Sequence, residues 1–156
     1  MGTHETTAHL SGHQGAIYDA LWDPNTRTWL TAGGDGIVAE WHAKGTGEGH
    51  ALLHHEKAFF ALGVHGNARA AGTENGELFI WEANQPEAVS RIEAHNNGIF
   101  AMASSRDSHW LTGGGDERIA LWRGTELRDE WSLPGAEKIR CMVHGPNSMF
   151  IGTTAG

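Results

Sequence analysis

The amino-acid sequence predicts an all-β protein built from a repeated unit of short antiparallel strands. The segment LTAGGDGIVAEW at residues 30–41 returns as LTGGGDERIALW at residues 111–122, with seven of the twelve positions identical. Residues 70–81, AAGTENGELFIW, keep the glycine-containing turn and the final tryptophan, so a tryptophan recurs at positions 41, 81 and 122. Glycine is frequent, at 22 of 156 residues, which together with many turn signals favours short strands over helices. A constant spacing of about 40 residues indicates a repeat architecture.

Four predicted strands fit into each period, separated by turns that contain Gly, Pro, Asn or Asp. In the first period, we expect strands at residues 16–22, 28–32, 37–41 and 51–54, with a glycine-rich loop at residues 44–49. The second period has strands at 58–64, 69–71, 77–81 and 88–92, and the third at 99–104, 110–112, 118–122 and 130–133. A leading strand at residues 3–10 and two final strands at 139–143 and 149–152 complete the pattern. Four strands in about 40 residues are typical of one blade of a β-propeller.

The chain is therefore expected to form about 3.75 blades of a single incomplete propeller over residues 1–156. We expect a leading outer strand at residues 1–10, blade 1 at 11–54, blade 2 at 55–94, blade 3 at 95–134 and the first half of blade 4 at 135–156. About fifteen strands are too few to close a ring, because seven blades need about 28 and four blades about 16. We expect either a missing C-terminal half or a second chain to close the propeller. We favour the missing half, because repeat arrays need capping units.

Charge and composition exclude several function classes. The formal net charge of −8 argues against a nucleic-acid-binding surface, which needs clustered Lys and Arg. The single Cys141 cannot form an internal disulfide and favours a reducing compartment. Residues 1–15 contain no signal-peptide pattern, and no segment approaches the roughly 18 apolar residues of a membrane span. We therefore expect a cytoplasmic protein without nucleic-acid or membrane partners.

Three features of the repeat resemble those of WD-repeat β-propellers. Gly12-His13 precedes the first strand of a blade, and His55 and His95 match this position less fully. In blades 1 and 3, a Thr lies ten residues before the tryptophan and an Asp lies six residues before it. In this family, such His, Ser/Thr, Asp and Trp side chains form a hydrogen-bonded tetrad that ties the blade together. The resemblance implies two structural tetrads, formed by His13, Thr31, Asp35 and Trp41 and by His95, Thr112, Asp116 and Trp122.

The sequence also departs from the family pattern. The Trp-Asp dipeptide that gives the family its name is absent, because Trp41, Trp81 and Trp122 are each followed by another residue type. Blade 2 has Ala71 and Asn75 at the Thr and Asp positions. Blade 4 has glycine at the His, Ser/Thr and acid positions, which are residues 135, 152 and 156. We therefore expect complete tetrads only in blades 1 and 3.

Residues suited to metal binding or catalysis do not form a recognisable motif. His50 and His54 would lie on one face of a strand, but no Cys or carboxylate has ligand spacing with them, and His55 belongs to the repeat. Gly-x-Ser-x-Gly, phosphate-loop and His-Glu-x-x-His motifs are absent from the sequence. We therefore expect no metal, no cofactor and no catalytic residues. The alternative is that the chain is part of a propeller enzyme, or of a larger multidomain protein, whose catalytic residues lie outside it.

The candidate binding residues are found one position after a repeated apolar residue in the first strand of each blade. Tyr18, Phe60 and Phe100 occupy this position in blades 1 to 3, and Arg140 occupies it in blade 4. In WD-repeat proteins, which these repeats resemble, this position lies beside the central channel, at the face that usually binds partners. The candidate partner-binding residues are Tyr18, Phe60, Phe100, Arg140, Glu74 and Lys138. We expect a non-catalytic scaffold that binds a protein or peptide through them; alternatively, the rings only fill the channel mouth and pack on one another.

Overall fold

The computed structural model describes residues 9–42, 49–104, 109–145 and 148–156, and these residues form β-strands and turns without a helix. The first sheet contains β1 (Ile17–Asp23), β2 (Thr28–Gly33), β3 (Ile37–His42) and β4 (His50–His54). The second contains β5 (Phe59–His65), β6 (Ala68–Thr73), β7 (Glu77–Glu82) and β8 (Gln85–Glu93). The third contains β9 (Ile99–Ser104), β10 (His109–Gly114), β11 (Arg118–Arg123) and β12 (Glu126–Ser132), and the last pairs β13 (Ile139–His144) with β14 (Met149–Thr153). The predicted fold of four-stranded antiparallel blades in an incomplete ring is confirmed.

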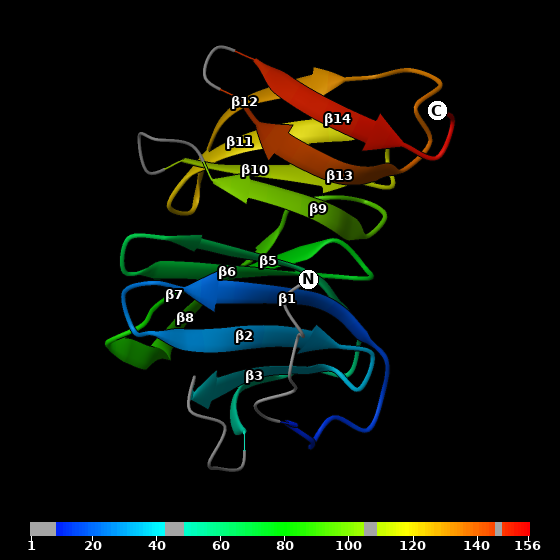
Figure 1. The fold of residues 1–156 in the computed structure, drawn as a ribbon. Helices are drawn as coiled ribbons and strands as arrows, with labels where there is room; N and C mark the ends of the chain where they lie inside the picture. Colours follow the sequence, from blue (N-terminus) through cyan, green and yellow to red (C-terminus); the bar gives the residue numbers. More distant parts are fainter. Residues whose placement is uncertain (1–8, 43–48, 105–108, 146–147) are drawn as a thin grey trace, which may run out of the picture.

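The sheets follow one another as blades of an open propeller (Figure 1). In every blade, each strand pairs with the next one along the chain. The first strands of consecutive blades, β1, β5, β9 and β13, contact one another in that order. They therefore form the inner side of the propeller segment. The described residues contain no helix, and hence none that is long and apolar enough to cross a membrane.

The structure differs from the sequence prediction mainly in the outermost strands. β12 begins at Glu126, whereas the prediction placed this strand at residues 130–133. All seven residues of β12 are exposed, so no apolar alternation marks the strand, and main-chain pairing with β11 alone defines it. Most of the loop predicted at 44–49 and of the leading strand predicted at 3–10 lies outside the described residues, and residues 9 and 10 are not in a strand.

One apolar residue at the start of each first strand packs between consecutive blades. Phe59, Ile99 and Ile139 occupy this position and are fully buried. Ile99 lies so close to the preceding blade that a Cβ atom added to Gly72 would be 2.6 Å from the Ile99 Cβ, nearer than non-bonded carbon atoms approach. Glycine is therefore required at position 72, where blade 3 packs. Ile17, the equivalent residue of blade 1, is 53% exposed, because none of the described sheets precedes it.

A buried arginine links blade 2 to blade 1. Arg69 on β6 is 1% exposed, and its Nε donates a hydrogen bond of 2.9 Å to the buried carboxylate of Asp23 at the end of β1. The same guanidinium donates to Thr26 Oγ1 at 2.8 Å and to Glu40 Oε1 at 2.7 Å. Every one of these contacts crosses from one blade to the next. Sequence reasoning missed Arg69, because blades 1 and 3 have tryptophan at its position, Trp29 and Trp110.

We predict that Arg69→Met lowers the free energy of unfolding by about 3 kcal/mol, because it leaves the Asp23 carboxylate buried without a counter-charge. Arg128→Met is the matched control, since Arg128 pairs with Glu126 on the exposed strand β12 and should contribute less than about 1 kcal/mol. Urea denaturation of both variants measures the difference. Equal losses of stability in the two variants would show that the link between the blades does not stabilise the fold.

Candidate functional site

The four predicted residues of the blade 1 tetrad lie in one hydrogen-bonded chain. The indole Nε1 of Trp41 donates to Thr31 Oγ1 at 2.7 Å, and the same hydroxyl lies 2.7 Å from His13 Nε2. The other ring nitrogen, His13 Nδ1, lies 2.9 Å from Asp35 Oδ2. The network therefore connects the loop before β1 to β2 and β3, as the chemistry of the four groups requires.

Blade 3 repeats the arrangement with the same atoms. Trp122 Nε1 donates to Thr112 Oγ1 at 2.9 Å, His95 Nε2 lies 2.8 Å from the same hydroxyl, and His95 Nδ1 lies 2.8 Å from Asp116 Oδ1. Because an ionised carboxylate only accepts hydrogen bonds, Nδ1 carries the proton of the neutral ring and donates to Asp116. Nε2 then accepts the hydrogen bond of the Thr112 hydroxyl, which in turn accepts that of Trp122.

Burial and hydrogen bonding set the protonation states of this network. Burial lowers the pKa of His95 below its ordinary value of 6.5 and outweighs the nearby Asp116 carboxylate, which raises it. Burial alone would raise the pKa of Asp116, but hydrogen bonds from the Asn96 N–H and from His95 hold that pKa below its ordinary value. A neutral imidazole and an ionised carboxylate follow at neutral pH.

Blade 2 contains a different arrangement at the same positions. Ala71 replaces the threonine, and the buried Nε1 of Trp81 has no hydrogen-bond partner among the described residues. His55 Nε2 lies 3.1 Å from the Glu77 carboxylate, which also accepts a 2.6 Å hydrogen bond from Arg91 Nε. Glu77 was missed by sequence reasoning, because blades 1 and 3 have isoleucine and arginine at its position.

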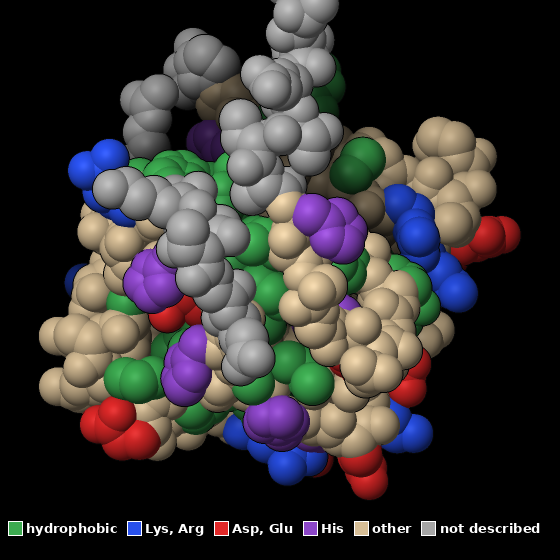
Figure 2. Space-filling model, turned by 60° about the horizontal axis from the view of Figure 1, so that its bottom comes forward, with side chains coloured by type: hydrophobic (Ala, Val, Ile, Leu, Met, Phe, Trp, Pro, Cys, Tyr) green, Lys and Arg blue, Asp and Glu red, His purple; other side chains and the backbone are tan. Residues whose placement is uncertain are grey.

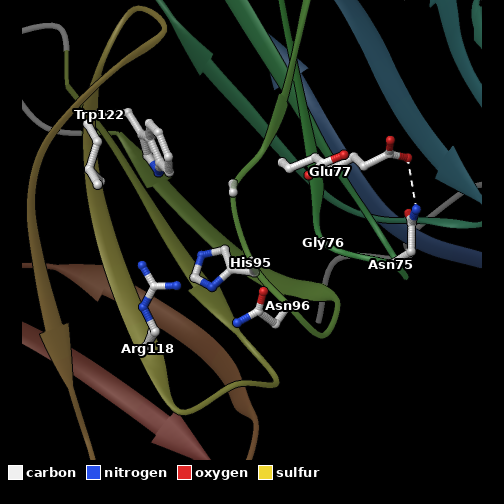
Figure 3. Close-up of a pocket in the computed structure, with 10 residues that line it drawn as sticks. Asn75, Gly76, Glu77, His95, Asn96, Arg118 and Trp122 are labelled. Carbon is white, nitrogen blue, oxygen red and sulfur yellow. Dashed lines mark hydrogen bonds between the residues drawn. The ribbon is translucent and has the colours of Figure 1, made fainter.

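A cavity of about 410 Å³ lies between blades 2 and 3, next to these networks (Figure 3). His95, Asn96 and Arg118 lie on one side of it, and Asn75 and Glu77 lie on the other. Two of its charged groups have partners, since Arg118 pairs with Asp116 and Glu130 and Glu77 pairs with Arg91 and His55. The charges of Arg118 and Glu77 are therefore compensated within blades 3 and 2.

Four of the six candidate partner-binding residues occupy a β-bulge in the first strand of their blade. On β1, Ile17 pairs with Gly33 and Asp19 pairs with Ala32, so Tyr18 is an extra residue without a partner on β2. The same irregularity surrounds the corresponding residues of the other blades, which are Phe60, Phe100 and Arg140. A bulge redirects the side chain of its extra residue. Because the bulge recurs, the four side chains occupy equivalent positions in four successive blades.

The three aromatic rings form a continuous row along this inner side. The rings of Tyr18 and Phe60 meet edge to face, with centroids 4.7 Å apart and an interplanar angle of 83°. Phe60 and Phe100 stack, with centroids 5.2 Å apart and an angle of 19°. Tyr18 is 54% exposed, while Phe60 and Phe100 are half-buried. The row is therefore packed and accessible at the same time.

Two cations extend the row at its blade 4 end. Lys138 Nζ lies 5.3 Å from the centroid of the Phe100 ring, and the guanidinium carbon of Arg140 lies 5.1 Å from it. Both distances are those of cation–π contacts. Glu74, the sixth candidate, does not join this group through its side chain, which instead lies 4.0 Å from Lys57 Nζ.

A groove of about 220 Å³ follows the aromatic row and contains a carboxylate that sequence reasoning missed. Asp19 lies in it next to Tyr18, and its Oδ2 accepts a 2.8 Å hydrogen bond from the Leu62 N–H of blade 2. Burial raises the pKa of Asp19 despite this hydrogen bond. The available signal was an acid at a position where the other blades have Ala61, Ala101 and Cys141.

Histidine side chains are scattered over the face shown in Figure 2, which includes blade 1. His50 and His54 both lie on β4 and are exposed, while His55 pairs with Glu77 in blade 2. Within the described ranges, no group of three or more His, Cys, Asp or Glu side chains could hold a metal ion.

The model of the family "WD domain, G-beta repeat" matches residues 4–42 and 86–123, which cover most of blades 1 and 3. The chain belongs to the WD-repeat β-propeller family. Echinoderm microtubule-associated protein-like 2 of Mus musculus is 26% identical over 89% of this chain. That match covers 23% of the relative, so the chain spans less than a quarter of the length of this relative.

Solved structures show the same fold. A chain in the structure of the computationally designed Ika4 protein matches with a TM-score of 0.77 and 21% identity, covering 99% of this chain and 95% of that one. A chain in the crystal structure of the mitotic checkpoint complex matches with a TM-score of 0.79 and 11% identity, covering 92% of this chain and 47% of that one. The WD-repeat blades of this chain therefore have the usual propeller geometry.

We predict that Trp41→Phe and Trp122→Phe each lower the free energy of unfolding by about 1 kcal/mol more than Trp81→Phe does. All three changes remove the same part of the ring, but only the first two remove an N–H that donates to a threonine. Thermal or chemical unfolding of the three variants measures the difference. Losses that are the same in all three would contradict a stabilising role of the tetrads.

The lowered pKa of His95 predicts a loss of stability in mild acid. The folded protein binds a proton on His95 more weakly than the unfolded chain does. The contribution of the neutral His95 ring to folding stability is therefore complete above pH 6.5 and is lost as the pH falls from there through the folded pKa. Below pH 6.5, the stability of the wild type should fall more steeply than that of His95→Gln, by up to about 1.4 kcal/mol per pH unit. Urea titrations at several pH values test this, and parallel pH profiles would contradict it.

Proposed function

We propose that this chain is a non-catalytic platform that binds a protein or peptide segment along the row formed by Tyr18, Phe60 and Phe100. The observation that carries the proposal is that these rings are partly exposed and contact one another in a row that crosses three blades. The packing of the rings on one another does not oppose binding. It holds each ring in one orientation, so a partner can contact them with little additional loss of side-chain entropy.

The family supports the same proposal at a coarser level. WD-repeat propellers in general serve as scaffolds for protein interactions. The relative from Mus musculus is described as microtubule-associated, and one of the similar solved chains is part of a complex. Neither partner is transferred to this chain, because the matches are partial and of low identity. They favour a protein partner over a small-molecule substrate.

The proposal also covers the classes of partner, the cellular location and the closure of the propeller. The net charge of −8 supports partners other than nucleic acids and membranes, and the single cysteine supports a cytoplasmic location. The half-exposed Ile17, whose equivalents are buried between blades, supports closure of the propeller by further sequence or by a second chain.

We predict that Tyr18→Ala and Phe100→Ala weaken partner binding at least tenfold, because both truncate rings of the proposed contact surface. Peptides selected on the wild-type protein from a phage-displayed library of random 12-residue sequences provide the probe, and fluorescence anisotropy gives their dissociation constants. Trp131→Ala is the matched control, since Trp131 is an aromatic residue of similar exposure on the outer strand β12.

The stability of the same variants separates binding from packing. Tyr18 is more than half exposed, so its truncation should cost less than about 1 kcal/mol of folding free energy. Failure of the library to yield peptides that depend on Tyr18 or Phe100 would overturn the proposal. A loss of several kcal/mol in stability with unchanged peptide affinity would assign the rings to packing alone.

A further inference from the structure

The two cations at the end of the aromatic row have no acidic partner among the described residues. Buried and half-buried cations elsewhere are neutralised, as Arg69 is by Asp23 and Arg118 by Glu130. Lys138 and Arg140 are both exposed, and each contacts the ring of Phe100. In a chain with a net charge of −8, two adjacent uncompensated cations beside an aromatic ring are a local exception.

The main chain holds these cations in position. The Lys138 N–H donates to Thr154 Oγ1 at 3.1 Å, and the Thr154 N–H donates to the Lys138 carbonyl at 3.0 Å. Arg140 is the extra residue of the bulge on β13, so its side chain leaves the sheet at the same place as the rings of the other blades. Arg140 therefore lines the groove, and Lys138 lies over the Phe100 ring at its edge. Both cations contact this ring before a partner binds, which lowers the cost of ordering them.

The charge of the groove selects among anionic groups. The groove contains the cation of Arg140 and the carboxylate of Asp19, and Lys138 lies at its edge over Phe100. The two cations and the one acid leave a net charge of +1 when Asp19 is ionised and +2 when it is neutral. This excess of positive charge favours an anionic group, and in an unmodified polypeptide segment that group is the carboxylate of Asp or Glu.

We propose that the groove recognises an acidic side chain, an Asp or Glu of the bound segment, whose carboxylate lies between Lys138 and Arg140. Neighbouring apolar side chains of the segment contact Phe60 and Tyr18. This inference rests on the proposed binding function and specifies the chemistry of the partner. Arg140 supplies a planar group that can donate two hydrogen bonds to one carboxylate, and Lys138 supplies a second positive charge.

The experiment uses the 12-residue peptides selected from the random library on the wild-type protein. We expect the selected peptides to be enriched in Asp or Glu at one position relative to an apolar residue. Replacing that acid by its amide in a synthetic peptide should weaken binding to the wild type about tenfold. The same replacement should change binding to Arg140→Gln or Lys138→Gln much less, because the interaction partner is already removed. Arg123→Gln, which removes an exposed cation at the opposite end of a blade, should bind like the wild type.

The outcomes distinguish a failure of this inference alone from a failure of the proposed function. Peptides that depend on Tyr18 but tolerate the amide replacement would overturn the acidic specificity and leave the platform intact. Selected peptides that ignore Tyr18 and Phe100, or a library without binders, would overturn both. A phosphoserine peptide that binds more than tenfold tighter than its glutamate counterpart would replace the carboxylate by a phosphate group. Affinity that is unchanged between low and high salt would also contradict the inference.

Discussion

The fold and the candidate site both depend on how each first strand meets the preceding blade. The buried residue at its start, such as Ile99, packs against a backbone that has no side chain at Gly72, which brings consecutive sheets into close contact. The bulge that follows turns the next side chain, Phe100, toward the inner side of the propeller. Adjacent residues of one strand therefore pack the blades together and place an aromatic ring on the inner side. A change in this register would displace the core residue and the candidate binding residue together.

The blades are stabilised by unlike networks on the same scaffold. Blades 1 and 3 connect their loops and strands through a Trp–Thr–His–Asp chain of neutral and charged hydrogen bonds. Blade 2 lacks the threonine, and its ionic groups contact neighbouring elements instead: Arg69 contacts blade 1, and Glu77 binds Arg91 and His55. A repeat protein can tolerate such divergence because every blade needs only enough internal and neighbour contacts to keep its sheet in place.

Sequence spacing was sufficient to predict most of the strands, their grouping into four-stranded sheets and the recurrence of one aromatic position, because these follow from a period of about 40 residues. The tryptophan, threonine and aspartate positions recur in phase, and so do Tyr18, Phe60 and Phe100. Features that occur in one blade only could not be found in this way. Arg69 and Asp19 make their contacts across blade boundaries, and no repeat marks their positions. The polar strand β12 was placed too late because main-chain pairing, not side-chain pattern, defines its start.

The ionic link through Arg69 also bears on how the chain unfolds. A propeller segment is a linear array, in which the unfolding of one unit is coupled to its neighbours by the interfaces between them. The contacts of Arg69 with Asp23 and Glu40 strengthen the interface between blades 1 and 2, whereas a cavity of about 410 Å³ lies between blades 2 and 3. Opening of blade 1 alone would leave Asp23 and Arg69 without each other as counter-charges, so the ionic link couples the opening of blade 1 to that of blade 2.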